Sequence, residues 1–218
     1  IFHALNQKAV ARRYAKSIGK KYEELNLIVV HLGGGISVGA HRKGLVIDVN
    51  NALNGEGPIS PERAGTVPSE ALATLCFSGK YTLNEVKKML HGKAGLAAYL
   101  GTSDMITIEE KAIEGKEPYK TLVAAMDYTV AKEIGAMFVA LKGQCDAIIL
   151  TGGIAYSDYC VADIKEQIEY LCKVVVLPGE NEMESLAENA FGALTGELPI
   201  LTYTGVSCAE EIPGMAEA

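Results

Sequence analysis

The sequence lacks the features of a membrane-spanning chain and of a chain stabilised by disulfides or bound metal. No window approaches the ~18 consecutive uncharged apolar residues that a helix needs to cross a bilayer. The five cysteines are odd in number and show no C-x-x-C spacing, which argues against a disulfide framework or a zinc site. The four histidines are scattered without metal-ligand spacing. These absences favour a cytoplasmic chain with reduced thiols.

The chain is also short of positive charge. It has 20 Lys plus Arg against 27 Asp plus Glu, for a net charge of −7. A protein of that sign has no global reason to bind nucleic acid or an anionic membrane. Its 218 residues, of which 49% are apolar, suffice for one large globular domain or two small ones.

Three common catalytic motifs are missing as well. No stretch reads G-x-x-x-x-G-K-[ST], and no glycine run has the G-x-G-x-x-G dinucleotide spacing, so neither a Walker nucleotidase nor a classical Rossmann enzyme is supported. The G-x-S-x-G elbow of a serine hydrolase is absent too. An unconventional nucleotide-binding fold remains.

The most informative stretch that is present runs from Leu27 to Val49. Residues 27–32 are a short Ile- and Val-rich run that predicts a buried strand, and three glycines follow it. Residues 36–40 and 45–49 flank His41 to Gly44, so the three segments predict a meander with a tight second turn. Consecutive glycines leave backbone N–H groups open to a ligand, which suits a phosphate. A plain glycine-rich hairpin is the alternative.

The flanking segments alternate between helices and long loops. Residues 4–25 predict a surface helix, and residues 50–69 form a Gly-, Pro- and Asn-rich loop longer than a minimal connection, which is typical of a functional loop. Further helices are expected over 69–77, 83–91 with Thr82 as N-cap, and 105–115. The longest helix is expected from Pro118 to Gly143, largely buried in the core.

The last third predicts parallel strands. Residues 146–150 and 173–177 are expected to be strands, and residues 159–171 and 182–195 helices. This order implies a crossover helix packed on one face of the sheet. Gly152-Gly153 then occupies a second glycine-rich strand exit, where such sheets bind ligands. The fold class is therefore α/β.

Five motifs in order resemble the butyrate kinase branch of the acetate kinase family, within the acetate and sugar kinase, Hsp70 and actin superfamily. They are FHALNQKAVAR (2–12), VVHLGGGISVGAHRKG (29–44), GPISPERAGTVP (57–68), LTGGIA (150–155) and LPGENEMESLAENA (177–190). The resemblance implies a ribonuclease-H-like (actin-like ATPase) domain with a mixed sheet and flanking helices. It also implies that a phosphoryl group is transferred from ATP to butyrate in the presence of Mg²⁺, giving butyryl phosphate and ADP. The enzyme is expected to be a homodimer.

The resemblance assigns catalytic roles to three residues. His3 would donate to the transition state, and Arg63 would clamp the carboxylate or phosphoryl group with its planar fork. His31 would line the substrate and phosphate side of the cleft. The structural alternatives are a residue at a helix start for His3, a loop salt bridge for Arg63 and a satisfied residue at a strand end for His31.

It assigns nucleotide contacts to three segments. The backbone N–H groups of Gly33, Gly34 and Gly35 would hold the β- or γ-phosphate. The adenine would meet Ser103, Asp104 and Met105, and the adenosine would border Gly152, Gly153 and Ile154. Glu182 would associate with Mg²⁺ through water, with Glu180 and Glu184 as neighbours that could share this role.

Two positions depart from the acetate kinase pattern. Ile106 stands where acetate kinases commonly carry an arginine, and Gln7 stands where they carry a second histidine. Both differences favour the butyrate branch. They leave the adenine contacts open. The sequence also leaves isobutyrate and other branched acids open as alternative substrates, because the volume of the acid pocket depends on side-chain positions and on the absent lobe.

The resemblance also implies a missing part. Family members begin with a lobe that bears an N-P-G-S-T-S-like phosphate loop and a catalytic aspartate, and neither is found here. Residues 1–198 are therefore expected to be the C-terminal lobe, with residues 199–218 as a tail. A non-catalytic nucleotide-binding or dimerisation lobe is the alternative to an enzyme.

Overall fold

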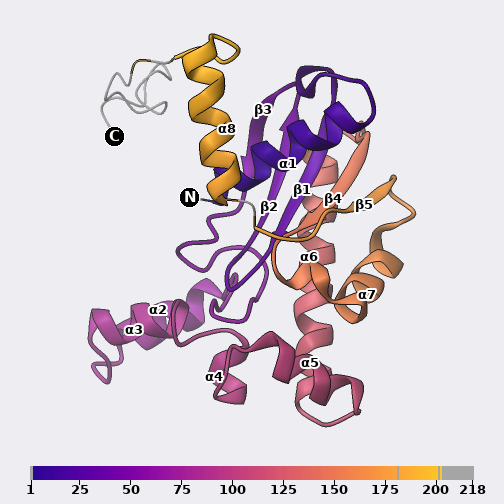
Figure 1. Cartoon of the computed structure of the whole chain (residues 1–218). Coiled ribbons are helices and arrows are strands. Elements are labelled where there is room, and N and C mark those ends of the chain that lie inside the picture. The colour runs from indigo at the N-terminus through magenta and orange to yellow at the C-terminus, as the bar shows by residue number, and fades with distance from the viewer. Residues whose placement is uncertain (1, 181, 201, 203–218) are drawn as a thin grey trace. The chain divides into compact units, whose positions relative to one another are not determined.

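Five strands of the described chain form one mixed sheet in the order β3-β2-β1-β4-β5 (Figure 1). The structure is a computed structural model, and it describes residues 2–180, 182–200 and 202. The described chain divides between Glu182 and Met183 into two compact units. The first contains the sheet and the helices α1 to α7, and the second contains nearly all of α8 (Glu182–Thr195).

The sheet confirms the predicted meander and the predicted parallel strands. β1 (Asn26–Leu32) pairs antiparallel with β2 (Ile36–Arg42), which pairs antiparallel with β3 (Leu45–Val49). On its other edge β1 runs parallel to β4 (Ala147–Thr151), and β4 runs parallel to β5 (Val174–Val176). The carboxyl ends of β1, β4 and β5 therefore meet at one edge of the sheet.

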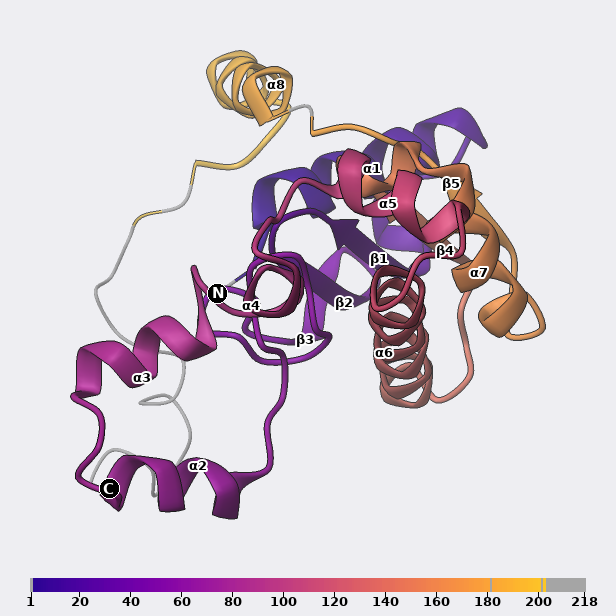
Figure 2. The same ribbon diagram turned by 90° about the horizontal axis from the view of Figure 1, so that it is seen from below.

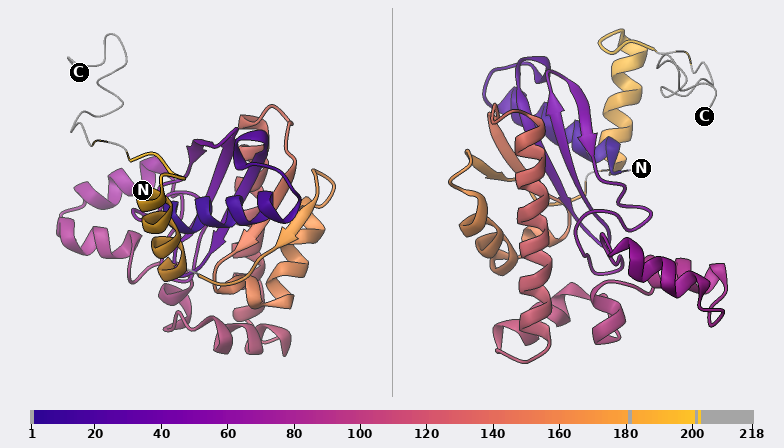
Figure 3. Two further views of the ribbon diagram at one scale, coloured as in Figure 1. Left: turned by 45° about the horizontal axis from the view of Figure 1, so that its top comes forward. Right: turned by 180° about the vertical axis from the view of Figure 1, so that it is seen from behind.

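β1 is the centre of the sheet and is buried along its whole length. Successive side chains of a strand point to opposite faces, so an apolar run without alternation must be covered on both. Ile28 and Val30 belong to the core on one face, whereas Leu27 and Val29 belong to a second core on the other. Figure 3 shows α1 across one face and α6 across the opposite face.

The long helix α6 (Tyr119–Ala140) covers the first face. Its buried residues Val123, Val130, Ile134 and Met137 recur at helical spacing and join the core of β1 and β2. Its outer side is solvated, since Val139 is 74% exposed. The prediction of a largely buried helix is thus correct for one face only.

The helices around α6 complete this layer. α5 (Met105–Ile113) and α7 (Asp158–Ile168) pack beside it. A short 3₁₀ turn, η2 (Ile154–Tyr156), connects β4 to α7. α7 begins one residue before the predicted start and ends three residues before the predicted end.

The first helix is shorter than its sequence pattern predicts. α1 (Ala4–Ser17) ends before Gly19, whose φ of +69° lies in the left-handed region that closes helices. The continuation to Leu25 is wrong, because the chain instead makes a 3₁₀ turn, η1 (Tyr22–Glu24). α1 is also more than a surface helix, since it buries polar as well as apolar side chains against the second face.

The turn between β2 and β3 is tighter than the predicted four residues. His41 and Arg42 belong to β2, and only Lys43 and Gly44 form the turn, with φ of +50° and +86°. Positive φ at both central residues matches the right-handed twist of the flanking strands.

Three further helices follow the long loop. α2 (Ser69–Phe77) and α3 (Leu83–Leu90) lie away from the sheet (Figure 2), whereas α4 (Leu96–Leu100) contacts α6 and buries Leu96 in the core. The predicted cap of α3 is confirmed, because the Thr82 side chain accepts a hydrogen bond from the Glu85 backbone N–H at 3.3 Å. No helix in the described residues is both long enough and apolar enough to span a bilayer.

Candidate active site

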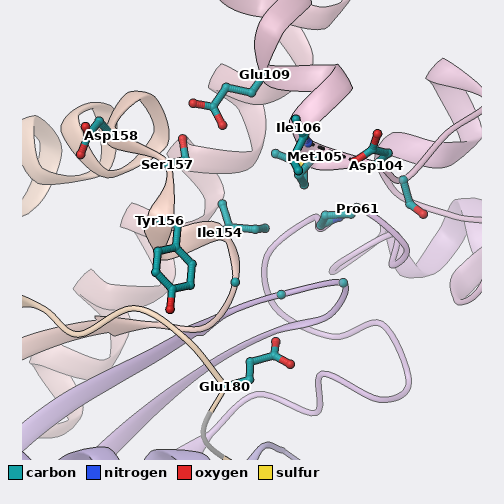
Figure 4. A pocket seen from close by; sticks show the side chains of 14 residues that line it. Pro61, Asp104, Met105, Ile106, Glu109, Ile154, Tyr156, Ser157, Asp158 and Glu180 are labelled. Carbon is teal, nitrogen blue, oxygen red and sulfur yellow. Dashed lines mark hydrogen bonds between the residues drawn. The ribbon is translucent and has the colours of Figure 1, made fainter.

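A cleft of about 700 Å³ opens where β1, β4 and β5 end. Open α/β sheets bind ligands at the carboxyl ends of their parallel strands, because the connecting loops leave a crevice there. Figure 4 shows the lining side chains, which come from five separate segments of the sequence. The lining residues are Gly33, Gly34, Pro61, Ser103, Asp104, Met105, Ile106, Glu109, Gly153, Ile154, Tyr156, Ser157, Asp158 and Glu180.

The two glycines after β4 differ in their surroundings. Gly152 is buried with φ of +91°, and a Cβ there would collide with the backbone of Leu32. Its backbone N–H and C=O pair with Gly179 at 3.2 and 3.0 Å, which joins the ends of β4 and β5. Gly153 has open space around it and lines the cleft with Ile154. Gly152 thus closes the sheet beneath the cleft.

The start of α5 forms the facing wall. The Asp104 carboxylate caps the helix by accepting hydrogen bonds from the Ile106 backbone N–H at 3.2 Å and the Thr107 hydroxyl at 2.6 Å. The hydroxyl bond is the main cause that lowers the pKa of Asp104. Ile106 is 72% exposed, so this wall offers an exposed apolar side chain beside the cap.

The long loop holds the glycine segment after β1 in place. The Gly34 carbonyl accepts hydrogen bonds from the Ser60 hydroxyl at 2.7 Å and the Glu62 backbone N–H at 3.1 Å. A Cβ at Gly34 would lie 3.3 Å from Glu62 Oε2, and one at Gly33 would lie 3.0 Å from Glu180 Oε1. A side chain at Gly34 would therefore crowd the Glu62 carboxylate, and one at Gly33 would crowd the Glu180 carboxylate.

A second, smaller cavity of about 200 Å³ adjoins the end of the glycine segment at Gly35. It is lined by Phe2, His3, Gly35, Ala52, Leu53 and Arg63. Gly33 and Gly34 line the large cleft, whereas Gly35 lines this cavity. The structure thus brings His3 and Arg63, 60 positions apart in sequence, to one site.

Arg63 carries an unsatisfied donor. Its Nη1 donates to the Glu62 carboxylate at 3.3 Å and to the Glu62 carbonyl at 3.3 Å. Its Nε is buried and has no hydrogen-bond partner among the described residues. A buried guanidinium N–H without a partner is costly, which fits a site that receives an anion.

His31 is a support beneath the site. It is 1% exposed, and it lines neither of the two cavities. Its ring stacks on that of His3 with centroids 3.7 Å apart, and its Nε2 lies 3.2 Å from Glu180 Oε1. Burial, and then nearby His3, lowers the pKa of His31 to about 3. The contact with Glu180 is therefore a hydrogen bond from a neutral imidazole.

Metal ligation rests on few groups. No cluster of three His, Cys, Asp or Glu side chains that could hold a metal occurs in the described part of the chain. The side chain of Glu182, the predicted Mg²⁺ residue, lies outside the described residues. Glu180 lines the large cleft next to Gly33, and a carboxylate with nucleotide phosphates is a common ligand set for Mg²⁺.

Sequence reasoning missed part of the cleft. Tyr156, Ser157, Asp158 and Glu109 line it without having been singled out. The first three follow Ile154 within four residues, so their place behind a strand exit was an available signal. Glu109 shares one face of α5 with Met105, one helical turn away.

The order of strands and helices, with a ligand cleft at the strand ends, defines a ribonuclease-H-like (actin-like ATPase) domain. Solved structures share this fold. An acetate kinase from Porphyromonas gingivalis matches with a TM-score of 0.81 at 23% identity, over 88% of this chain and 55% of that one. A propionate kinase from Francisella tularensis matches with a TM-score of 0.75 at 22% identity, over 84% of this chain and 53% of that one.

The chain belongs to the Acetokinase family, whose profile matches residues 1–191. A protein named probable butyrate kinase from Phocaeicola vulgatus is 72% identical over 203 residues, which are 93% of this chain and 57% of the relative. A protein with the same name from Bacteroides thetaiotaomicron is 56% identical over 203 residues, which are 93% of this chain and 58% of the relative. The chain thus spans somewhat more than half the length of these relatives.

Proposed function

We propose that this chain supplies the nucleotide-binding wall of an enzyme that phosphorylates butyrate with ATP. One observation carries the proposal: in the segment Gly33–Gly35, the first two glycines line the large cleft and the third lines the small cavity with His3 and Arg63. A nucleotide in the cleft can present its terminal phosphate at this segment, and a short carboxylate can approach from the cavity. Residues 1–198 act in this proposal as the C-terminal lobe of the whole enzyme.

The large cleft suits ATP. Ile106 and Ile154 offer apolar surface for the adenine, close to Ser103, Asp104 and Met105. Gly153 leaves room for the ribose, and the backbone N–H groups of the Gly33–Gly35 segment can donate to the phosphates without interposed side chains. A volume of about 700 Å³ is in the range of ligand-binding clefts.

The small cavity suits the carboxylate and the transferring group. A carboxylate oxygen of butyrate attacks the γ-phosphorus, its new bond to phosphorus replaces the bond to the β–γ bridging oxygen, and ADP leaves. Charge on the phosphoryl oxygens is stabilised by positioned donors. Arg63, whose Nε has no partner in the part of the chain that the structure describes, and His3 are the donors in this cavity. Phe2 and Leu53 supply an apolar wall for the acyl chain.

Mg²⁺ fits the same scheme. Glu180, at the cleft wall, and Glu182, two residues further on, would hold it together with the phosphates. When bound, the ion would neutralise charge on the phosphate oxygens.

The test combines ATP binding with acyl phosphate formation. The chain is mixed with ATP, Mg²⁺ and butyrate, with acetate and isobutyrate in parallel, and acyl phosphate is trapped as the hydroxamate; ATP binding is measured by calorimetry. Arg63→Ala should abolish most hydroxamate formation, by roughly 100-fold or more, and leave ATP binding within about twofold. Arg42→Ala is the matched control, since Arg42 is exposed at the end of β2.

The outcomes separate the alternatives. Hydroxamate formation that prefers butyrate and is lost in Arg63→Ala supports the proposal. ATP binding without transfer supports the nucleotide-binding lobe alone and requires the remainder of the enzyme for activity. Absence of ATP binding contradicts the role given to the large cleft.

A further inference from the structure

A line of hydrogen-bonded polar side chains is buried between α1 and the strands β1 and β2. It joins Tyr22, His41, Gln7, Ser37 and His3 in that order. Gln7, Ser37 and His41 are fully buried, and Tyr22 is 4% exposed. Groups this deep must be satisfied by one another, so the direction of each hydrogen bond is constrained.

A backbone carbonyl sets the direction. The Gln7 side-chain nitrogen Nε2 lies 3.2 Å from the Ser37 carbonyl oxygen and 2.8 Å from the Ser37 hydroxyl. A carbonyl can only accept, so the amide nitrogen of Gln7 must face Ser37 and its oxygen must face away. The reverse orientation would place two oxygens in contact.

The direction passes to His3 through one hydroxyl. Ser37 Oγ accepts from Gln7 at 2.8 Å. Because Ser37 is fully buried, its own hydrogen needs an acceptor, and among its contacts in the described residues His3 Nδ1, 2.9 Å away, is the atom that can accept it. An imidazole nitrogen that accepts carries no proton, so the proton of neutral His3 resides on Nε2. The ring that carries it lines the small cavity.

The other end of the line is consistent with this direction. The Gln7 oxygen Oε1 accepts from His41 Nε2 at 3.0 Å, which leaves His41 Nδ1 to accept from the Tyr22 hydroxyl at 2.7 Å. Burial is the main cause that lowers the pKa of His41 to about 4 and raises the pKa of Tyr22 to about 12. Both groups are therefore neutral at pH 7, as the pattern requires.

The strand makes room for the amide. Gly39 lies between Ser37 and His41 on the same face of β2. A Cβ at Gly39 would collide with Gln7 Oε1 and lie 3.1 Å from His41 Nε2. Any other residue at this position would push Gln7 out of the line.

We propose that Gln7 and Ser37 are positioning residues that hold His3 in the tautomer with its proton on Nε2. The Gln7 amide fixes the direction of the hydrogen bonds, and the Ser37 hydroxyl passes this direction on to His3. On the other side, His41 donates to Gln7 Oε1 and accepts from Tyr22. The role of this tautomer in phosphoryl transfer rests on the proposed function, whereas the tautomer itself does not.

The tautomer is measured directly by long-range ¹H–¹⁵N NMR of the imidazole rings in the 218-residue chain. The chain has four histidines, so their signals can be assigned by single substitutions. At pH 7, His3 should show a protonated Nε2 and an unprotonated Nδ1, and His41 should show the same pattern. A proton on Nδ1 of His3 in the unaltered chain overturns the proposal.

Variants test the two positioning residues. Ser37→Ala and Gln7→Leu should each leave His3 as a mixture of tautomers, and Ser37→Thr, which keeps the hydroxyl, should restore the single form. Ser78→Ala, at an exposed serine, is the matched control and should change nothing. Gly39→Ala should act like Gln7→Leu. An unchanged His3 signal in a folded Ser37→Ala or Gln7→Leu variant overturns the roles of these residues.

Activity is a separate readout. In hydroxamate-forming enzyme, Ser37→Ala should lower kcat by about tenfold with little change in KM, as expected when a partner that orients a functional side chain is lost. Ser37→Thr should recover it. A correct tautomer pattern without any phosphoryl transfer leaves the positioning line intact and contradicts only the proposed function.

Discussion

Two glycines of this chain have different roles: Gly33 is expected to matter mainly for ATP binding, and Gly152 for folding. Gly33 lies outside the left-handed region, and a methyl group there would lie 3.0 Å from Glu180 Oε1 and 3.1 Å from His31 Nε2. We expect Gly33→Ala to displace the Glu180 side chain and weaken ATP binding about tenfold, with a loss of about 1 kcal/mol in the free energy of unfolding. Calorimetry and urea unfolding measure the two effects.

Gly152 is the matched contrast. Its φ of +91° and its contact with the Leu32 backbone leave no room for a Cβ. Gly152→Ala should therefore cost roughly 2 kcal/mol or more in the free energy of unfolding. Urea unfolding that matches the unaltered chain would contradict a structural role for Gly152.

Asp127 should make stability depend on pH. It is fully buried in α6, neither carboxylate oxygen has a hydrogen-bond partner among the described residues, and burial, then nearby Asp163, raises its pKa from 3.8 to about 8. The folded state keeps a proton that the unfolded state releases, so stability falls as pH rises from about 4 to about 8. Asp127→Asn should remove this loss.

The measurement is urea unfolding of both proteins at several pH values. Between pH 5 and pH 8 the variant should gain roughly 2–4 kcal/mol over the unaltered chain, at ~1.4 kcal/mol per pKa unit. Asp158→Asn is a control, because Asp158 is exposed at the start of α7. Parallel pH curves for the unaltered chain and Asp127→Asn would contradict the buried, protonated state.

At the scale of elements, α6 stabilises the sheet through one face. Ile134 is fully buried against the core of β1 and β2, whereas Val139 is 74% exposed on the same helix. Ile134→Ala should cost about 2–5 kcal/mol in the free energy of unfolding, because it leaves a cavity. Val139→Ala should change it by less than about 0.5 kcal/mol. Equal losses in urea unfolding would contradict the orientation of α6.

At the scale of the molecule, ligand binding and folding are linked. A ligand that binds only the folded state stabilises it in proportion to the logarithm of its concentration. ATP at 100 times its Kd should raise the free energy of unfolding by about 2.7 kcal/mol. Thermal unfolding with and without ATP measures this, and Gly33→Ala should need about tenfold more ATP for the same shift. A thermal unfolding midpoint that does not change when ATP is added would contradict the large cleft as the ATP site.

Much of the fold was predictable because its signals are local. The run from Leu27 to Leu32, the tight turn at Gly44 and the cap at Thr82 depend on a few neighbouring residues, and each appears in the structure. The end of α1 was not predictable from its apolar spacing. Helical periodicity continued to Tyr22, but Gly19 with positive φ stopped the helix first.

The candidate site divides in the same way. The sequence indicated the glycine exits and, through its resemblance, His3 and Arg63, because chain order and residue type are enough to name them. It could not separate Gly152 from Gly153, since the difference lies in contact with Leu32 on another strand. It also could not place His31 beneath His3, because ring stacking joins α1 to β1 across 28 positions.

By itself, then, the sequence determined roughly where most strands and helices form, which segments are rich in glycine, and which family the motifs resemble. Only the tertiary structure decided that Gly33 and Gly34 line one cavity and Gly35 another, that Arg63 Nε has no partner among the described residues, and that Gln7 and Ser37 form a hydrogen-bonded line to His3. The physical reason is the distance along the sequence over which each kind of interaction acts. Backbone preference acts over a few residues, whereas cavities and hydrogen-bond direction depend on groups that meet only after the sheet has assembled.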